Sequence, residues 1–163
     1  MLTEKTVCDS GRFLFELEMS NYVKNCLLTD AFYRRYQNCP EIEQKFTRPY
    51  IRVEVVLDGI LWAIPLRSSI KHKYAIWTDK DNGCGIDLTK AVVVEHSAEY
   101  ISDTQPHIRE NEFRVIKQLD NHFVASKLKK YILDYKKAKT HPEIKRNENL
   151  LRCSTLQYFE DYI

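Results

Sequence analysis

Two runs of strand-forming residues joined by Asp-Gly constrain the fold of this chain more than any other feature. The run RPYIRVEVVL precedes Asp58-Gly59, and ILWAIPLR follows it. β-Branched and aromatic residues dominate both runs, which favours strands, and Asp-Gly supplies the positive φ angles that a two-residue type I′ turn requires. The sequence therefore predicts an antiparallel β-hairpin over residues 48–67.

Shorter signals flank this hairpin on both sides. Upstream, RFLFELEM at 12–19 has the composition of a strand, and SNYVKNCLL after it predicts a short helix with Ser20 as N-cap. The polar stretch 34–47 is typical of a loop. Downstream, DKDNGCG at 79–85 predicts a turn, and IDLTKAVVV at 86–94 predicts a third core strand.

The C-terminal part of the chain has a helical pattern. Apolar residues recur at helical spacing between residues 113 and 135, HPEIKRNENLL predicts a second helix with Pro142 near its first turn, and STLQYFEDYI predicts a third with Ser154 as cap. At 163 residues the chain fits one domain, 1–163. We expect an α+β fold: a compact, highly bent antiparallel sheet or β-barrel with a helical N-terminal insertion and a helical C-terminal half.

Composition places the chain among soluble globular proteins. Charged residues make up 29% and hydrophobic residues 44% of the sequence, and no apolar run approaches the roughly 18–20 residues that span a bilayer. The N-terminus MLTEKTVCDSGRF has no apolar signal core, so we expect a cytoplasmic protein without a membrane partner. The five cysteines form no CxxC pair, which favours reduced, structural thiols over a zinc site.

Charge is distributed unevenly along the chain. The formal net charge is +2, yet residues 113–146 contain ten Lys or Arg against three acids. Such a basic segment is expected where a protein meets a polyanion, and it is also compatible with a solvated, lysine-rich helix face. Charge alone leaves both interpretations open.

A polar cluster, RSSIKHK, follows the second strand of the hairpin. Several common explanations fail on spacing. In DKDNG the glycine falls at the fifth position of a calcium loop where the sixth is required, and the twelfth position is Lys90 where a Glu is required. The sequence also lacks HExxH, GxxxxGK[ST], GxGxxG and GxSxG motifs.

The remaining explanation for the polar cluster is a reaction that cations and hydroxyl groups carry out without a metal or cofactor. RNA cleavage by its own 2′-OH is such a reaction, because the protein need only orient the substrate, move protons and stabilise a phosphorane. Ser68, Ser69, Lys71 and His72 are suitable residue types, provided that the chain bends after Leu66. The plain alternative is a polar loop whose charges are solvated.

The segments RPYIRVEVVLDGILWAIPLRSSIKHK, GIDLTKAVVV and RNENLLRCSTLQYFEDYI together resemble the toxins of type III toxin–antitoxin systems, the ToxN/AbiQ family, and most closely its CptN- and TenpN-like branches. The resemblance runs from residue 13 to the C-terminus. It implies a MazF/Kid-like bent barrel that cuts RNA without metal, leaving 2′,3′-cyclic phosphate and 5′-hydroxyl ends. It also implies a role in abortive infection of phage-infected cells and inhibition by a small pseudoknotted RNA, which the toxin processes and binds in a closed toxin–RNA assembly.

The family's catalytic motif maps onto the polar cluster. A Ser or Thr pair after Pro-Leu, followed by Lys, corresponds to Ser68, Ser69 and Lys71, although Arg67 and Ile70 are extra residues here. A family tyrosine corresponds to Tyr22 in SNYVK, which either binds substrate or packs. The candidate catalytic residues are Ser68, Ser69, Lys71, His72 and Tyr22. The candidate RNA-binding residues are Arg48, Arg67, Lys73, Lys90, Lys127, Lys130 and Lys137.

Three classes of function remain open at this stage. An RNA-cleaving toxin accounts for both the polar cluster and the basic segment. A non-catalytic RNA-binding barrel accounts for the charge alone, and a small-molecule enzyme or structural adaptor leaves the basic segment unexplained.

Overall fold

The structure, a computed structural model, describes residues 22–57 and 59–163, without the side chains of 53–57. The strand expected at 12–19 and the helix cap expected at Ser20 lie outside the described residues.

The predicted hairpin is confirmed and forms the centre of the fold. Strand β2 (Tyr50–Leu57) pairs antiparallel with β3 (Ile60–Arg67), and Leu57 faces Ile60 across the turn. Gly59 has a φ of +78°, which a residue with a side chain rarely adopts. The register is irregular between Val53 and Leu57.

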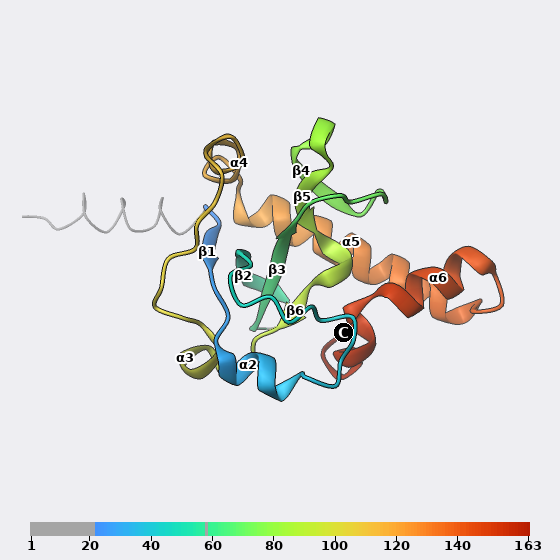
Figure 1. Cartoon of the computed structure of the whole chain (residues 1–163). Coiled ribbons are helices and arrows are strands. Elements are labelled where there is room, and N and C mark those ends of the chain that lie inside the picture. Colours follow the sequence, from blue (N-terminus) through green and yellow to red (C-terminus); the bar gives the residue numbers. More distant parts are fainter. Residues whose placement is uncertain (1–21, 58) are drawn as a thin grey trace, which may run out of the picture.

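Four shorter strands complete an antiparallel sheet around this hairpin (Figure 1). Strand β1 (Lys24–Cys26) pairs with β2. The other edge of β3 is shared by β6 (Val92–Val93), near its start, and β5 (Cys84–Asp87), at its end. Strand β4 (Ala75–Asp79) pairs with β5. The sheet among the described residues is open, so the expected closed barrel is not confirmed, whereas the α+β class is.

The strand expected at 86–94 is interrupted. A single 3-10 turn, η2 (Leu88–Lys90), separates β5 from β6, while both strands stay against β3. The cause is local, because the Asp87 carboxylate accepts a hydrogen bond from the backbone N–H of Thr89 and stabilises a turn in place of a continued ladder. The turn expected at 79–85 is confirmed, with η1 (Lys80–Asn82) followed by Gly83 at a φ of +64°.

The prediction of a helix after Ser20 is wrong for the residues that the structure describes. Residues 24–26 form the edge strand β1, and the helix α2 (Asp30–Arg35) begins later, capped by the hydroxyl of Thr29. A short helix, α3 (Ser97–Tyr100), packs against α2. The loop expected at 34–47 is found at 36–49, because Arg34 and Arg35 belong to α2, and it leads into the hairpin.

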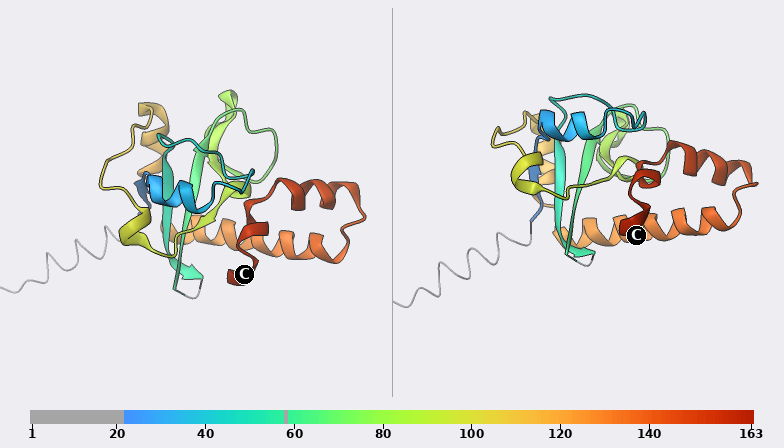
Figure 2. Two further views of the ribbon diagram at one scale, coloured as in Figure 1. Left: turned by 60° about the horizontal axis from the view of Figure 1, so that its bottom comes forward. Right: turned by 90° about the horizontal axis from the view of Figure 1, so that it is seen from below.

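The helical C-terminal half is confirmed, but the helical run expected over 113–135 is broken between residues 117 and 120, and the third expected helix forms two 3-10 turns. This half contains α4 (Glu110–Ile116), α5 (Asn121–Thr140), α6 (Lys145–Cys153) and the 3-10 turns η3 (Thr155–Tyr158) and η4 (Glu160–Tyr162). Pro142 precedes α6 in a turn, and Ser154 caps η3 as predicted. Figure 2 shows α5 running along the sheet and past its edge, where α6 lies beside it.

One connected core joins the sheet to these helices. Trp62 of β3 is fully buried, and its ring lies 6.3 Å from that of Phe159, beside η3. Tyr131 and Leu128 of α5 are buried against the same core. None of the helices in the described part of the chain is long and apolar enough to span a bilayer.

Candidate functional site

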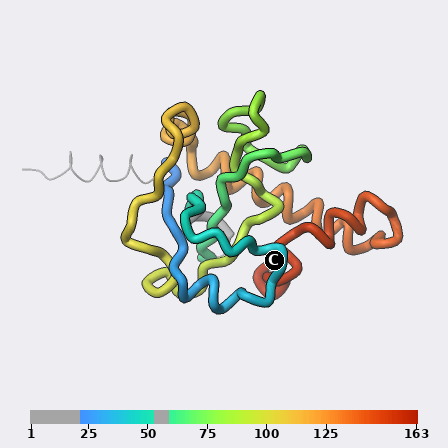
Figure 3. Tube along the Cα trace, in the orientation of Figure 1, coloured from blue at the N-terminus to red at the C-terminus, as the bar shows by residue number. Residues whose placement is uncertain are grey.

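Residues 68–74 connect β3 to β4, and the polar cluster occupies 68–73 of this loop. The loop projects from the end of β3 above the C-terminal helices in Figure 3. The chain bends at Ser69, whose φ of +59° is unusual for a residue with a side chain. The predicted bend after Leu66 is therefore present, and it leaves Ser68, Ser69 and Lys71 exposed.

Ile70 anchors the middle of this loop. Its side chain is buried, and its backbone N–H donates to the carbonyl of Gly83 at 3.0 Å. A Cβ at Gly83 would lie 3.4 Å from the Ile70 nitrogen, in addition to requiring a positive φ, so glycine suits both the turn and the close approach. The hydroxyl and ammonium groups on either side of Ile70 are thus presented from a fixed point.

Asp87, at the end of β5, is the buried acid beneath the loop. Its carboxylate accepts hydrogen bonds from Arg67 Nη1 at 2.7 Å, Thr89 Oγ1 at 2.6 Å and the Thr89 backbone N–H at 3.0 Å, and it lies 3.3 Å from His72 Nε2. Burial favours the neutral acid, but the hydrogen bonds from His72, Thr89 and Arg67 outweigh it and lower the pKa of Asp87 to about 2.

His72 uses both ring nitrogens within the protein. Nδ1 lies 3.2 Å from the backbone N–H of Tyr74, which donates to it, and Nε2 faces Asp87 Oδ1 at 3.3 Å. The tautomer protonated on Nε2 satisfies both contacts. In this arrangement His72 holds the end of the loop on Asp87, and neither nitrogen is directed to a substrate. Among the described residues, His72 thus fixes the backbone beside Lys71 through these two contacts.

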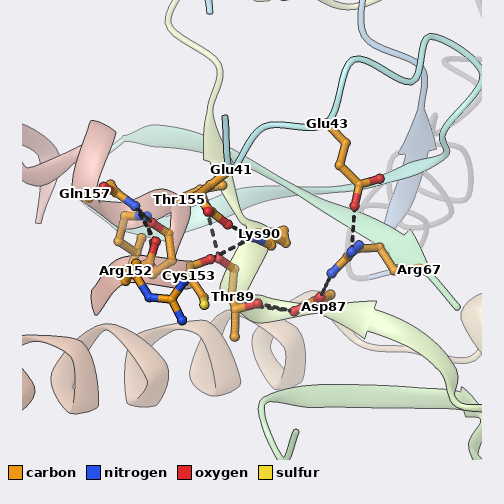
Figure 4. Close-up of polar contacts among 12 residues, drawn as sticks. Glu41, Glu43, Arg67, Asp87, Thr89, Lys90, Arg152, Cys153, Thr155 and Gln157 are labelled. Atoms are coloured by element: carbon orange, nitrogen blue, oxygen red, sulfur yellow. Dashed lines mark hydrogen bonds and ion pairs between the residues drawn. The ribbon is translucent and has the colours of Figure 1, made fainter. Parts of the chain in front are cut away.

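Arg67 and Arg48, both expected to bind RNA, share the carboxylate of Glu43. Arg67 Nη2 donates to Glu43 at 2.6 Å, and Arg48 forms the second ion pair. Figure 4 shows Arg67 between Glu43 and Asp87, with Thr89 on the far side of Asp87. Burial raises the pKa of Glu43, but the two guanidinium groups outweigh it and lower the pKa below its ordinary value.

Lys90 lies away from the polar loop, at the end of η2. Its ammonium group pairs with Glu41 and donates to the carbonyl of Cys153 at 2.7 Å, and its side chain is only 14% exposed (Figure 4). Thr155 adds a hydrogen bond to the carbonyl of Thr89 at 3.2 Å. Lys90 thus joins the loop of residues 36–49, η2 and the end of α6, and most of its surface is unavailable to RNA.

Tyr22 is separate from the cluster. It is 51% exposed and forms an isolated β-bridge with Asp120 at the start of α5. The register aligns Lys24, Arg52 and Ala63 in one row, so Tyr22 lies toward the hairpin turn, whereas Ser68 follows the opposite end of β3. The structure does not bring Tyr22 together with Ser68 and Lys71.

Two basic regions of the surface reach the polar loop, one a single cleft and the other a pair of adjoining hollows. A cleft of about 540 Å³, here called the Ser68 cleft, is lined at the start of the loop by Arg67 and Ser68. Two adjoining hollows of about 630 and 160 Å³ share Lys73, Tyr74 and Asp134, and we call them the α5 groove. Four of the expected RNA-binding residues line the α5 groove: Lys73, Lys127, Lys130 and Lys137.

Sequence reasoning missed Asp87, Thr89 and Glu43. The signal for Asp87 was present, because an acid followed by Leu-Thr interrupts the apolar run GIDLTKAVVV, and such an acid must find partners if it is buried. Glu43 lies in a polar loop and gave no local signal. Among residues 22–57 and 59–163, no group of three or more His, Cys, Asp or Glu is placed to hold a metal ion.

Comparisons of this chain with models of protein families, with curated proteins and with solved structures found no match.

Proposed function

We propose that this protein is an RNA-cleaving toxin of the ToxN/AbiQ type. The observation that carries the proposal is the grouping of Ser68, Ser69 and Lys71 on an anchored loop whose two ends reach basic hollows. Hydroxyl and ammonium groups beside cationic surface suit a phosphodiester, whose charge increases as the phosphorane forms.

The reaction is transesterification within the RNA. The substrate 2′-oxygen attacks phosphorus and gives its proton to solvent water, the bond from phosphorus to the 5′-oxygen breaks, and that oxygen takes a proton from the ammonium group of Lys71, which solvent then reprotonates. The products are a 2′,3′-cyclic phosphate and a 5′-hydroxyl. Lys71 neutralises the phosphorane and protonates the leaving oxygen, and the hydroxyls of Ser68 and Ser69 donate to non-bridging oxygens.

The α5 groove is the proposed site for the small pseudoknotted RNA antitoxin. Lys73, Lys127, Lys130 and Lys137 line it, and Asp134 is the one acid among its described lining residues. Phosphate contacts by such residues supply sequence-independent affinity. We further propose that this binding forms the closed toxin–RNA assembly that the sequence resemblance implies, in the cytoplasm and in phage defence or plasmid maintenance, with the bent sheet as counterpart of the family's barrel.

A non-catalytic RNA-binding module is the second candidate. The observation that favours it is the engagement of both His72 nitrogens by Tyr74 and Asp87, which removes the residue best suited to transfer protons near neutral pH. Under this alternative the Ser68 cleft and the α5 groove bind RNA, and the loop hydroxyls contribute hydrogen bonds only.

Incubation of the protein with RNA in excess EDTA separates the two candidates. The toxin cuts RNA, whereas the module retains it uncut, and a protein that does neither contradicts both. Replacing the 2′-OH on the 5′ side of the cut by hydrogen must block cleavage, because the nucleophile is then missing. Cleavage of that substrate shows that water attacks and rejects the mechanism.

Substitutions test the assigned residues. We expect Lys71→Ala and Ser68→Ala each to lower the cleavage rate by about 10²–10³-fold, as for loss of one transition-state donor. Lys80→Ala, at an exposed position in η1, is the control and should cleave normally. Ser69→Gly removes a hydroxyl while suiting the positive φ, so any loss of its activity reports the hydroxyl and not the bend.

A further inference from the structure

The Ser68 cleft is lined by basic residues that lie outside the α5 groove, the site proposed above for the antitoxin. Four of its lining residues are Lys or Arg, namely Lys45, Arg48, Arg67 and Arg109, and they face two acids, Glu43 and Glu112. His107 lies in the same wall. The formal charge of the lining is therefore +2 with His107 neutral, which favours an anionic ligand.

Both acids that line the Ser68 cleft already form ion pairs. Glu43 serves both Arg48 and Arg67, and Glu112 is paired with Arg109, whose Nε donates to it at 2.8 Å. Lys45 and His107 are exposed, and their side chains make no hydrogen bond or ion pair with any residue that the structure describes. The positive charge of the cleft is thus open to a ligand.

Arg48 lines the cleft but is already held by groups of the protein. Its side chain is buried, 9% exposed as a residue, and its Nε is covered by protein atoms without any acceptor among the described residues. Among the described residues, Glu43 and the carbonyl of Leu66, at 3.3 Å from Nη1, engage the guanidinium. Arg67 also pairs with Asp87, so the two arginines meet two carboxylates, and the exposed Lys45 is the cation of the cleft that a ligand can reach.

The cleft is continuous with the proposed catalytic loop. Arg67 and Ser68 line the cleft at the start of the loop, and Lys73 lines the α5 groove at its end. A free phosphorylated molecule would fill one hollow only. A single strand of RNA, which carries a phosphate at each nucleotide, is the ligand that uses both hollows and the exposed groups between them.

We infer that the Ser68 cleft binds the phosphates of nucleotides flanking the cut in single-stranded RNA, and that the substrate strand continues across residues 68–73 into the α5 groove. The inference rests on the proposed function for its substrate. It adds a binding site that lies apart from the basic helix, in which Lys45 is the available cation with His107 beside it, while acids hold Arg48, Arg67 and Arg109. Glu43 opposes binding there, because its carboxylate occupies Arg48 and Arg67.

The test uses a fluorescein-labelled 12-nucleotide RNA pool of mixed sequence with every 2′-OH methylated, so that it binds but is not cut. Anisotropy titrations at three salt concentrations compare wild type with Lys45→Glu and with Lys117→Glu. Lys117 is the matched control, since it is exposed and lies outside both hollows. Both changes alter the charge by two.

We expect Lys45→Glu to weaken binding about 5–10-fold at low salt and to reduce the log–log salt slope by about 0.7, the value for one lost phosphate contact. Lys117→Glu should match wild type. Glu43→Gln should act in the opposite direction and tighten binding, because it removes a negative charge from the cleft and releases Arg48 from its carboxylate, although Arg67 keeps Asp87. An unchanged affinity and slope for Lys45→Glu overturns the inference, as does a wild-type protein that fails to bind the pool.

Two further arms separate the alternatives. Adenosine monophosphate is titrated against the bound pool, and displacement at micromolar concentration that depends on Lys45 identifies a mononucleotide site and overturns the strand path. Cleavage of unmodified RNA by wild type is measured separately. Loss of the proposed function appears as no cleavage there, whereas loss of the inference appears in the binding of methylated RNA.

Discussion

Two sets of cations that look alike in the sequence have different surroundings in the structure. Arg48, Arg67 and Lys90, here the paired set, each meet a carboxylate from Glu41, Glu43 or Asp87. Lys127, Lys130 and Lys137, the groove set, line an open surface where Asp134 is the one acid among the described lining residues.

The difference teaches that the availability of a basic residue depends on the acids that the fold brings to it. A cation held by a buried or shared carboxylate contributes mainly to the stability of the fold, because both charges lose solvent together. An exposed cation contributes mainly to the binding of polyanions. The following predictions test this division, beginning with the largest effect.

Removal of the acid beneath the paired set should have the largest effect. We expect Asp87→Ala to lower the free energy of unfolding by about 3–5 kcal/mol, because it leaves Arg67 without its buried partner and His72 without its support. Urea unfolding monitored by circular dichroism measures this. Asp81→Ala, at an exposed position in η1, is the control. A loss below about 1 kcal/mol would mean that the ion pairs of Asp87 contribute little to the stability of the fold.

The same carboxylate should make stability depend on pH. Its pKa in the folded protein is about 2, below the ordinary value of 3.8, so its contribution is complete above pH 4 and is lost as the pH falls toward 2. The contribution is about 2 kcal/mol, since each pH unit between the two values is worth about 1.4 kcal/mol. Unfolding at pH 5 and pH 2.5 should differ less for Asp87→Asn than for wild type. An equal difference would show that other carboxylates control the acid transition.

Charge reversal in the groove set should affect RNA and leave the fold unchanged. For the triple change of Lys127, Lys130 and Lys137 to Glu, we expect antitoxin affinity to fall about 10–100-fold and the salt slope to decrease by about 2. Cleavage of a short single-stranded substrate should fall less. Filter binding at three salt concentrations measures the slope. A control triple change of Lys117, Lys129 and Lys136 to Glu has the same charge but lies outside the hollows. Equal slopes for the two triples would mean that the groove set is merely solvated.

Lys90 gives the smallest and most direct comparison between the two sets. Lys90→Met should lower the free energy of unfolding by about 1–3 kcal/mol, through loss of its bonds to Glu41 and the Cys153 carbonyl, and should leave the salt slope unchanged. Lys130→Met should do the reverse. Thermal unfolding and RNA binding are measured for both variants, to test whether Lys90→Met changes stability alone and Lys130→Met changes the salt slope alone. A changed slope for Lys90→Met would return Lys90 to the RNA-binding residues.

Local signals predicted the hairpin and the C-terminal helices, and distant contacts account for what the sequence did not reveal. Asp58-Gly59 and the helical spacing of apolar residues act within a few residues. Strand β1, in contrast, exists because β2 offers it an edge more than twenty residues later, and its own sequence favours a helix equally.

The candidate site follows the same rule. The residue types of the cluster were predictable from RSSIKHK, and a bend after Leu66 was recognised as a requirement, but its position at Ser69 and the partners were not predictable. Lys90 and Glu41 are 49 residues apart in the sequence, and Arg67 and Asp87 are 20 apart. Because either lysine or arginine is compatible with binding RNA, only the fold distinguishes a cation that is paired from one that is available.

The burial of Ile70 between two exposed arms of the loop bears on how such a protein diverges. The path of the loop is set by Ile70 and by Gly83 beneath it, and not by the side chains at positions 68, 69, 71 and 73. Positions 68, 71 and 73 are therefore free to accept new residues without moving the backbone, whereas position 69 favours residues that tolerate its positive φ. Related proteins that evolve toward other targets should vary the arms while retaining an apolar residue and a glycine at the two anchoring positions.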